Sequence, residues 1–137
     1  MQFFFIFLQL YARVEAANNG IAFFESKIRP VLVSQCYSCH SSRNADVKGG
    51  LALDSKEGLL KGGDSGPAIV VGDPDKSLLI KALEHTEFEM PPDEKLSTNV
   101  INDFKTWIKH GAIDPRVKVQ DRKMELAQAK KFWSFKI

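Results

Sequence analysis

The feature that most constrains this chain is a Cys-Tyr-Ser-Cys-His run at residues 36–40. Two thiols three positions apart lie on the same side of a helical turn, where they can form thioether bonds with the two vinyl groups on one edge of a porphyrin. His40 follows directly and can reach the iron. Each fixed residue therefore has its own chemical task, and the pattern predicts a covalently attached c-type haem on Cys36 and Cys39 with His40 as an iron ligand.

Other uses of the two cysteines fit less well. A structural zinc site needs four ligands, and outside the motif the chain offers only His85 and His110, which are 25 positions apart rather than about three to five. A thioredoxin-like dithiol needs a strand before the first cysteine, whereas a helical pattern precedes Cys36. A structural pair of thiols leaves His40 without a role. Two cysteines are also too few for a multi-disulfide scaffold.

Haem iron has a second axial position, and Met90 is the candidate to fill it. It precedes two prolines that stiffen the backbone and lies 50 positions after His40. A rigid holder suits a weak iron–sulfur bond, because a flexible loop would lose that bond to entropy. Two alternatives stay open: Met90 as a residue that fills a gap in the core, and His85 as the rival ligand. His110 is most simply a favourable partner of a helix dipole.

The first residues have the pattern of an export signal. An apolar stretch starts at Phe3, and Val14 and Ala16 are slim residues of the kind that a signal peptidase reads, so residues 1–16 are predicted to be a signal peptide. No Lys or Arg precedes the apolar stretch, and a first helix that packs in the core is the alternative. Export would place the mature chain in the periplasm or another extracytoplasmic compartment.

A first helix is predicted from residue 21 to Cys36, because apolar residues recur there at helical spacing. Pro30 lacks an amide donor and predicts a break or kink in it. The following residues 41–74 are rich in glycine and predict a long loop region, which in so small a domain is expected to wrap around something.

Two further helices are predicted beyond this loop. Asp73 followed by a proline is a favourable helix start and predicts a helix over about residues 74–84. Ser97 can cap a final helix over residues 97–110, whose apolar residues repeat at three and four positions and which Gly111 is placed to end.

Length and charge limit the class of protein. A chain of 137 residues is near the size of one domain, predicted at residues 17–115, and a formal charge of +2 provides no field of the kind that attracts nucleic acid. The apolar runs are too short for a membrane-spanning helix. Residues 116–137 contain seven Lys or Arg and two acidic residues, and they are predicted to be a separate basic tail.

Five segments of the chain are distinctive: residues 24–40 (FESKIRPVLVSQCYSCH), 48–55 (KGGLALDS), 72–80 (GDPDKSLLI), 90–92 (MPP) and 96–115. Together they resemble the planctomycete-type cytochrome c domain. The resemblance covers about residues 17–115 and implies covalent c-type haem on Cys36 and Cys39, with His40 as the proximal and Met90 as the distal ligand. Members of that family often begin much larger exported proteins, and residues 132–135 (FWSF) resemble the start of a downstream region.

We therefore expect an all-α fold, a small cytochrome c-like helical domain around one haem, with the glycine-rich loop at its edge. The expected function is one-electron transfer with an unidentified redox partner protein, not catalysis. A haem-bearing enzyme or ligand sensor with an open distal position is the alternative, and a haem-free dithiol module is a third reading. The residues expected to form the apolar walls are Leu51, Leu53, Ile69, Val70, Leu79, Leu83, Phe104 and Ile108.

Overall fold

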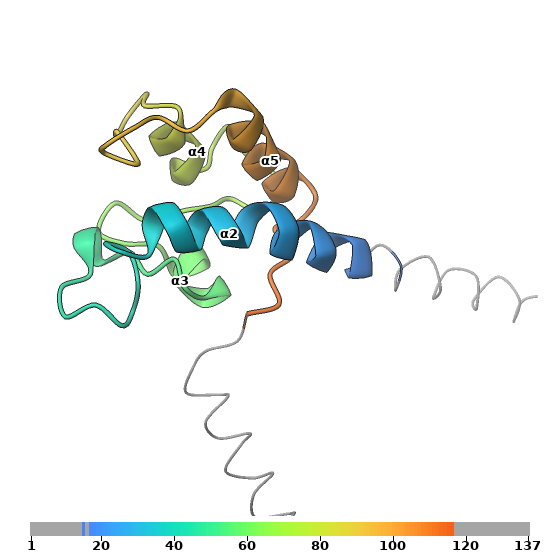
Figure 1. Ribbon diagram of the computed structural model, residues 1–137, viewed down its shortest axis with the longest axis horizontal. Helices are drawn as coiled ribbons and strands as arrows, with labels where there is room; N and C mark the ends of the chain where they lie inside the picture. The colour runs from blue at the N-terminus through green and yellow to red at the C-terminus, as the bar shows by residue number, and fades with distance from the viewer. Residues whose placement is uncertain (1–14, 16, 117–137) are drawn as a thin grey trace, which may run out of the picture.

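The computed structural model describes residues 15 and 17–116, which form helices joined by turns and irregular segments (Figure 1). This part of the chain contains two isolated β-bridges and no strand, so the predicted helical class is confirmed. The basic tail beyond Arg116 and, apart from Glu15, the predicted signal peptide lie outside the described residues. The helical elements are η1 (Phe24–Ile28), α2 (Arg29–Val31), η2 (Leu32–Cys36), η3 (Lys48–Gly50), α3 (Lys56–Lys61), α4 (Leu78–Leu83) and α5 (Thr98–Lys109).

Residues 17–36 form one continuous helical run, here called the N-terminal helix, so the predicted break at Pro30 is wrong. The helix widens into π turns instead, and the N–H of Arg29 donates to the carbonyl oxygen of Phe24, five residues back. Proline removes a donor and crowds the preceding turn, and a wider turn is one way for a helix to accommodate it without ending. The helix therefore reaches Cys36, which lies in its last turn.

The N-terminal helix separates two groups of elements. Figure 1 shows α4 and α5 along one side of it and α3 with the loop that precedes it on the other. Phe24 of the N-terminal helix packs against Trp107 of α5, with ring centroids 5.7 Å apart, and Phe104 meets the same indole edge-on at 6.3 Å. These three rings are buried and form the centre of the core.

The last helix is formed as the sequence predicts. The side chain of Ser97 caps α5 by accepting from the N–H of Val100, and Gly111 follows the helix with a φ of +96°. Glycine adopts this left-handed conformation without the steric cost that a side chain would bring. Among the described residues, no helix is both long and apolar enough to cross a membrane.

The second predicted helix starts later than expected, at Leu78 rather than at residue 74. Asp73 caps a turn instead, accepting from the N–H of Lys76 at 3.2 Å. The fully buried hydroxyl of Ser77 donates to the carbonyl oxygen of Asp73 at 2.8 Å and accepts from the N–H of Val70 at 2.9 Å. This closed turn satisfies the backbone groups that would otherwise begin the helix.

Helix α3 interrupts the stretch that the sequence predicts to be loop. Ser55 caps it by accepting from the N–H of Gly58, at 3.0 Å. The glycines around α3 permit close backbone contacts, because a Cβ on Gly63 would come within 2.2 Å of the carbonyl oxygen of Gly49. The segments before and after α3 are thereby held against each other, with the N–H of Asp64 donating to that same carbonyl oxygen at 2.9 Å.

Candidate functional site

The four predicted site residues Cys36, Cys39, His40 and Met90 all line one cavity of about 550 Å³. This volume is within the range of about 300–1,000 Å³ that is usual for small-molecule and cofactor sites. The wall comes from the end of the N-terminal helix, the segments on both sides of α3, α4, and the residues between α4 and α5. The cavity therefore brings together residues as far apart in the sequence as Cys36 and Met90, which are 54 positions apart.

Four of the residues expected to form apolar walls do line this cavity: Leu51, Leu53, Leu79 and Leu83. Ile69, Phe104 and Ile108 are buried in the core elsewhere. Val70 is 40% exposed, so its assignment to the interior is wrong. It lies at the start of the turn that Asp73 closes by donating its N–H to the Val70 carbonyl, and such a turn holds its first residue at the surface.

The backbone of the Cys-Tyr-Ser-Cys-His motif is held at every carbonyl oxygen. That of Cys36 accepts from the N–H groups of Cys39 and His40, at 3.2 and 2.8 Å. The amide of Asn44 donates to the next two carbonyls, at 3.1 Å each. The last two accept from the N–H groups of Lys48 and Leu53, at 3.1 and 2.8 Å. With every acceptor paired, the motif has little freedom to change conformation.

The imidazole of His40 is oriented by a backbone group. Its Nδ1 lies 3.3 Å from the carbonyl oxygen of Leu51. A carbonyl oxygen only accepts, so this contact requires the proton on Nδ1 and leaves the lone pair of Nε2 free. A second hydrogen bond of this kind is the usual way in which a metal-ligating histidine is oriented.

The two thiols differ in their surroundings, and both are free. Cys36 is buried, and burial raises the pKa of its thiol to about 11, whereas Cys39 is exposed. A redox-active dithiol requires the opposite, a thiol with a lowered pKa. The haem-free dithiol reading is therefore not supported at Cys36.

Met90 is presented by a segment that is tied back onto α4. Its N–H donates to the carbonyl oxygen of Ala82 at 3.2 Å, and the N–H and hydroxyl of Thr86 both donate to the carbonyl oxygen of Lys81. Lys81 also pairs with Glu87 at 2.6 Å. The Met90 side chain is 39% exposed, so it lies at the rim of the cavity rather than at its deepest point.

The other two histidines have different surroundings. His85 is not among the residues that line the cavity, although its Nε2 is buried without a hydrogen-bond partner in the described part of the chain. Nδ1 of His110 lies 2.8 Å from the carbonyl oxygen of Thr106 at the end of α5, as expected for a residue that interacts with the helix terminus. Within residues 15 and 17–116, no three His, Cys, Asp or Glu side chains gather into a group that could hold a metal ion.

Three residues that support the site were not anticipated from the sequence. Besides Asn44, Oδ2 of Asp54 accepts from the hydroxyls of Ser41 and Ser42 and from the N–H of Ser42, at 2.8–2.9 Å. Arg116, assigned to the basic tail, is buried and contacts Tyr37 of the motif. Short polar side chains next to a motif are a usable signal for such anchors, but a contact across 79 positions leaves none in the local sequence.

Comparison with known proteins adds the family. Residues 36–94 match the sequence profile of the planctomycete cytochrome C family. This match agrees with the resemblance drawn from the sequence motifs. No curated protein and no solved structure matches the chain significantly. The planctomycete cytochrome C match begins at Cys36 and extends past Met90, so it includes all four predicted site residues.

The donor atoms at the cavity fit the haem that a cytochrome c domain implies. Two thiols lie three positions apart in the motif, a histidine offers a free Nε2 lone pair, and a thioether lies on a separate segment of the cavity wall. The leucines between them keep the interior apolar. Thioether-forming thiols, an imidazole and a soft sulfur are the ligand types of c-type cytochromes with histidine and methionine.

Proposed function

We propose that this chain is a c-type cytochrome module that holds one haem covalently and transfers single electrons. The observation that carries the proposal is that Cys36, Cys39, His40 and Met90 line a single apolar cavity in a domain of the planctomycete cytochrome C family. Two thiols alone would suit several functions. Their combination with an oriented imidazole and a thioether is specific to haem.

The residues have separate roles in this proposal. Cys36 and Cys39 would hold the porphyrin through thioether bonds, and His40 would ligate the iron through Nε2. Met90 would be the second iron ligand, and a thioether ligand favours the ferrous state and raises the reduction potential. When bound, the haem iron supplies a reversible one-electron change between its ferric and ferrous forms. Leu51, Leu53, Leu79 and Leu83 would exclude water around it.

Expression of the full chain together with a cytochrome c maturation system tests the proposal. The intact mass should increase by one haem, and the haem should survive acid-acetone extraction because thioether bonds are covalent. Cys36→Ala with Cys39→Ala should abolish the added mass, whereas Ser38→Ala, a change at an exposed position of the same motif, should retain it. A colourless wild-type protein of unmodified mass with two free thiols would reject the proposal.

The exposure of Met90 supports an alternative function in which the second iron ligand is displaced. A thioether that is 39% exposed at the cavity rim is easier to displace than a buried one, and a displaced ligand would leave a position open to a small molecule. The protein would then be a haem enzyme or a ligand sensor. Carbon monoxide binding distinguishes the two readings, because a closed electron carrier does not bind it readily at neutral pH.

We also propose that the chain is exported and acts outside the cytoplasm, because covalent haem attachment and the apolar start of the sequence agree on that location. N-terminal sequencing of secreted protein should begin at or near Ala17. Recovery of intact Met1 on haem-free protein from the cytoplasm would contradict this assignment. The redox partner would be another protein of that compartment.

A further inference from the structure

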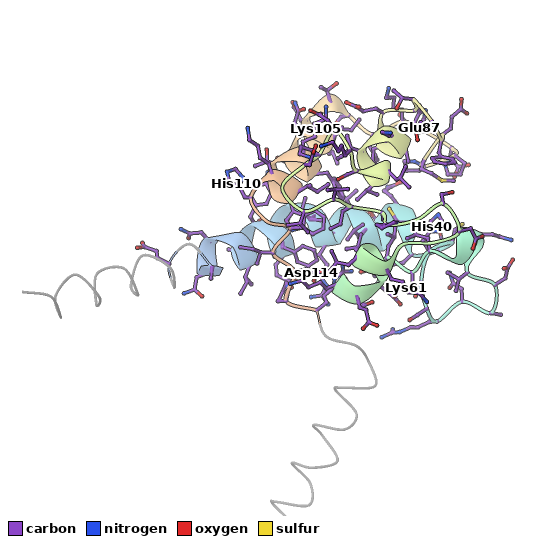
Figure 2. All side chains as sticks on the ribbon, turned by 180° about the vertical axis from the view of Figure 1, so that it is seen from behind. His40, Lys61, Glu87, Lys105, His110 and Asp114 are labelled. Carbon is purple, nitrogen blue, oxygen red and sulfur yellow. The ribbon has the colours of Figure 1, made fainter. Side chains whose placement is uncertain are left out.

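The guanidinium of Arg116 is buried at the end of the described chain. Arg116 is 8% exposed, and its Nε and Nη2 donate to the two carboxylate oxygens of Asp114 at 2.9 and 2.6 Å. The guanidinium also lies over the ring of Phe24, 4.9 Å from its centre. Figure 2 shows Asp114 on the side of the N-terminal helix opposite to Lys105 of α5 and to His110, which follows α5. A buried charge of this kind is tolerated because its partner neutralises it.

The remaining donor of Arg116 connects two segments at the haem-binding motif. Nη1 donates to the phenol oxygen of Tyr37, the second residue of the motif, and to the carbonyl oxygen of Leu53 at 2.7 Å. The planar guanidinium suits this task, because it presents several donors in one fixed arrangement. A lysine ammonium could not reach Asp114, Tyr37 and Leu53 in the same way.

Leu53 links Arg116 to His40. The carbonyl oxygen of Leu53 accepts from Arg116, and its N–H donates to the carbonyl oxygen of His40 at 2.8 Å. Two residues earlier, the carbonyl oxygen of Leu51 lies 3.3 Å from Nδ1 of His40. This contact is longer than the usual N–H···O distance of about 2.9–3.0 Å, so a small movement of residues 51–53 would break it.

We propose that Arg116 is a positioning residue for His40. It holds residues 51–53 and Tyr37 in place, so that the carbonyl oxygen of Leu51 keeps the ring proton on Nδ1 and leaves Nε2 free to ligate iron. The inference rests on the proposed function for its effect on haem, but the position of the ring proton is a property of the chain itself. A hydrogen bond to Nδ1 makes the imidazole a stronger electron donor, which favours the ferric state.

The first test measures the ring proton in the haem-free full chain by correlated ¹⁵N–¹H spectra of the histidine ring. In the wild type, His40 should be mainly the Nδ1–H tautomer. Arg116→Lys keeps the positive charge beside Asp114 but loses the planar guanidinium that also donates to Tyr37 and Leu53. It should shift His40 toward the Nε2–H tautomer. Arg43→Lys, the same change at an exposed arginine near His40, should have no effect. An unchanged tautomer ratio in folded Arg116→Lys would overturn the inference.

The second test measures the midpoint potential of the haem-loaded protein. Arg116→Lys should shift it to a more positive value, and Arg43→Lys should leave it unchanged. Tyr37→Phe removes one acceptor of Arg116 and should give a smaller shift in the same direction, which keeps the test decisive if Arg116→Lys does not fold. Potentials equal to that of the wild type would overturn the inference even if stability fell. Failure of the wild type to take up haem would instead reject the proposed function, and the tautomer ratio would still decide the role of Arg116.

Discussion

The side-chain amide of Asn44 donates to the carbonyl oxygen of Tyr37 at 3.1 Å, from seven residues further along the chain. The same amide nitrogen also donates to the carbonyl oxygen of Ser38. These carbonyls belong to the two variable positions between the cysteines. The conformation of the motif is therefore fixed by a residue that lies outside it.

Replacement of Asn44 should loosen the motif without removing any haem ligand. Asn44→Asp has almost the same shape but no N–H to donate, so it leaves two carbonyl oxygens unpaired. The expected loss in the free energy of unfolding is about 1–3 kcal/mol, measured by chemical denaturation. Asn44→Gln keeps the donor and should lose less. Equal stability of Asn44→Asp and the wild type would show that the amide does not hold the motif.

Removal of the Met90 thioether should open the distal side of the proposed haem. Met90→Ala should allow the ferrous protein to bind carbon monoxide and the ferric protein to bind cyanide, and Met90→His should lower the midpoint potential because imidazole favours the ferric state more than a thioether does. Both variants should lose the weak long-wavelength absorption of sulfur bound to ferric haem. Phe88→Leu, on the same segment but without a donor atom, should retain it. Ready binding of carbon monoxide by the wild type would support the enzyme or sensor alternative.

The two thiols of the haem-free chain should differ in reactivity. Because burial raises the pKa of Cys36 to about 11, only about one in a thousand of its thiols is ionised near pH 8. Iodoacetamide should therefore modify the exposed Cys39 well before Cys36, as measured by peptide mass spectrometry. The rate at Cys36 should rise as the pH approaches 11. Equal rates at neutral pH would contradict the burial of Cys36, and denatured protein provides the reference in which both react.

Asp54 should make stability depend on pH in the acidic range. Its burial raises the pKa, but the hydrogen bonds from Ser42 and Ser41 outweigh this effect, and the pKa is lowered from the usual 3.8. Ionised Asp54 therefore contributes stability that is fully present above pH 3.8 and is lost as the pH falls through the lowered value. Thermal unfolding from about pH 6 to about pH 3 should show a smaller loss for Asp54→Asn than for the wild type. Parallel curves for the two proteins would contradict the role of Asp54.

The sequence predicts the features that local residues determine. α5 is predicted correctly because its cap at Ser97, its apolar spacing and Gly111 all act within one helix. The beginning of α4 is not predicted correctly, because the same Asp73-Pro74 pair can start a helix or a turn. The hydrogen bonds of the buried Ser77 hydroxyl stabilise the turn. Helix α3 is missed because glycines on both sides of it suggest loop.

The candidate site is likewise predicted from the sequence only where local residues determine it. The spacing of Cys36 and Cys39 together with the adjacent His40 is enough to suggest a haem attachment site, and the prolines after Met90 are enough to suggest a rigid holder. The orientation of His40 is not accessible from the sequence, because it depends on a backbone carbonyl at Leu51 that any residue type would provide. The contribution of Arg116 depends on a contact across 79 positions and on the fold that brings them together.

The burial of Arg116 also determines where the domain can be cut for transfer to other proteins. A fragment that stops at Pro115 would retain the buried carboxylate of Asp114 but lose the cation that neutralises it. The transferable domain therefore extends at least through Arg116, which is the first residue of the predicted basic tail. A fusion designer should count the first basic residue of that stretch as part of the domain.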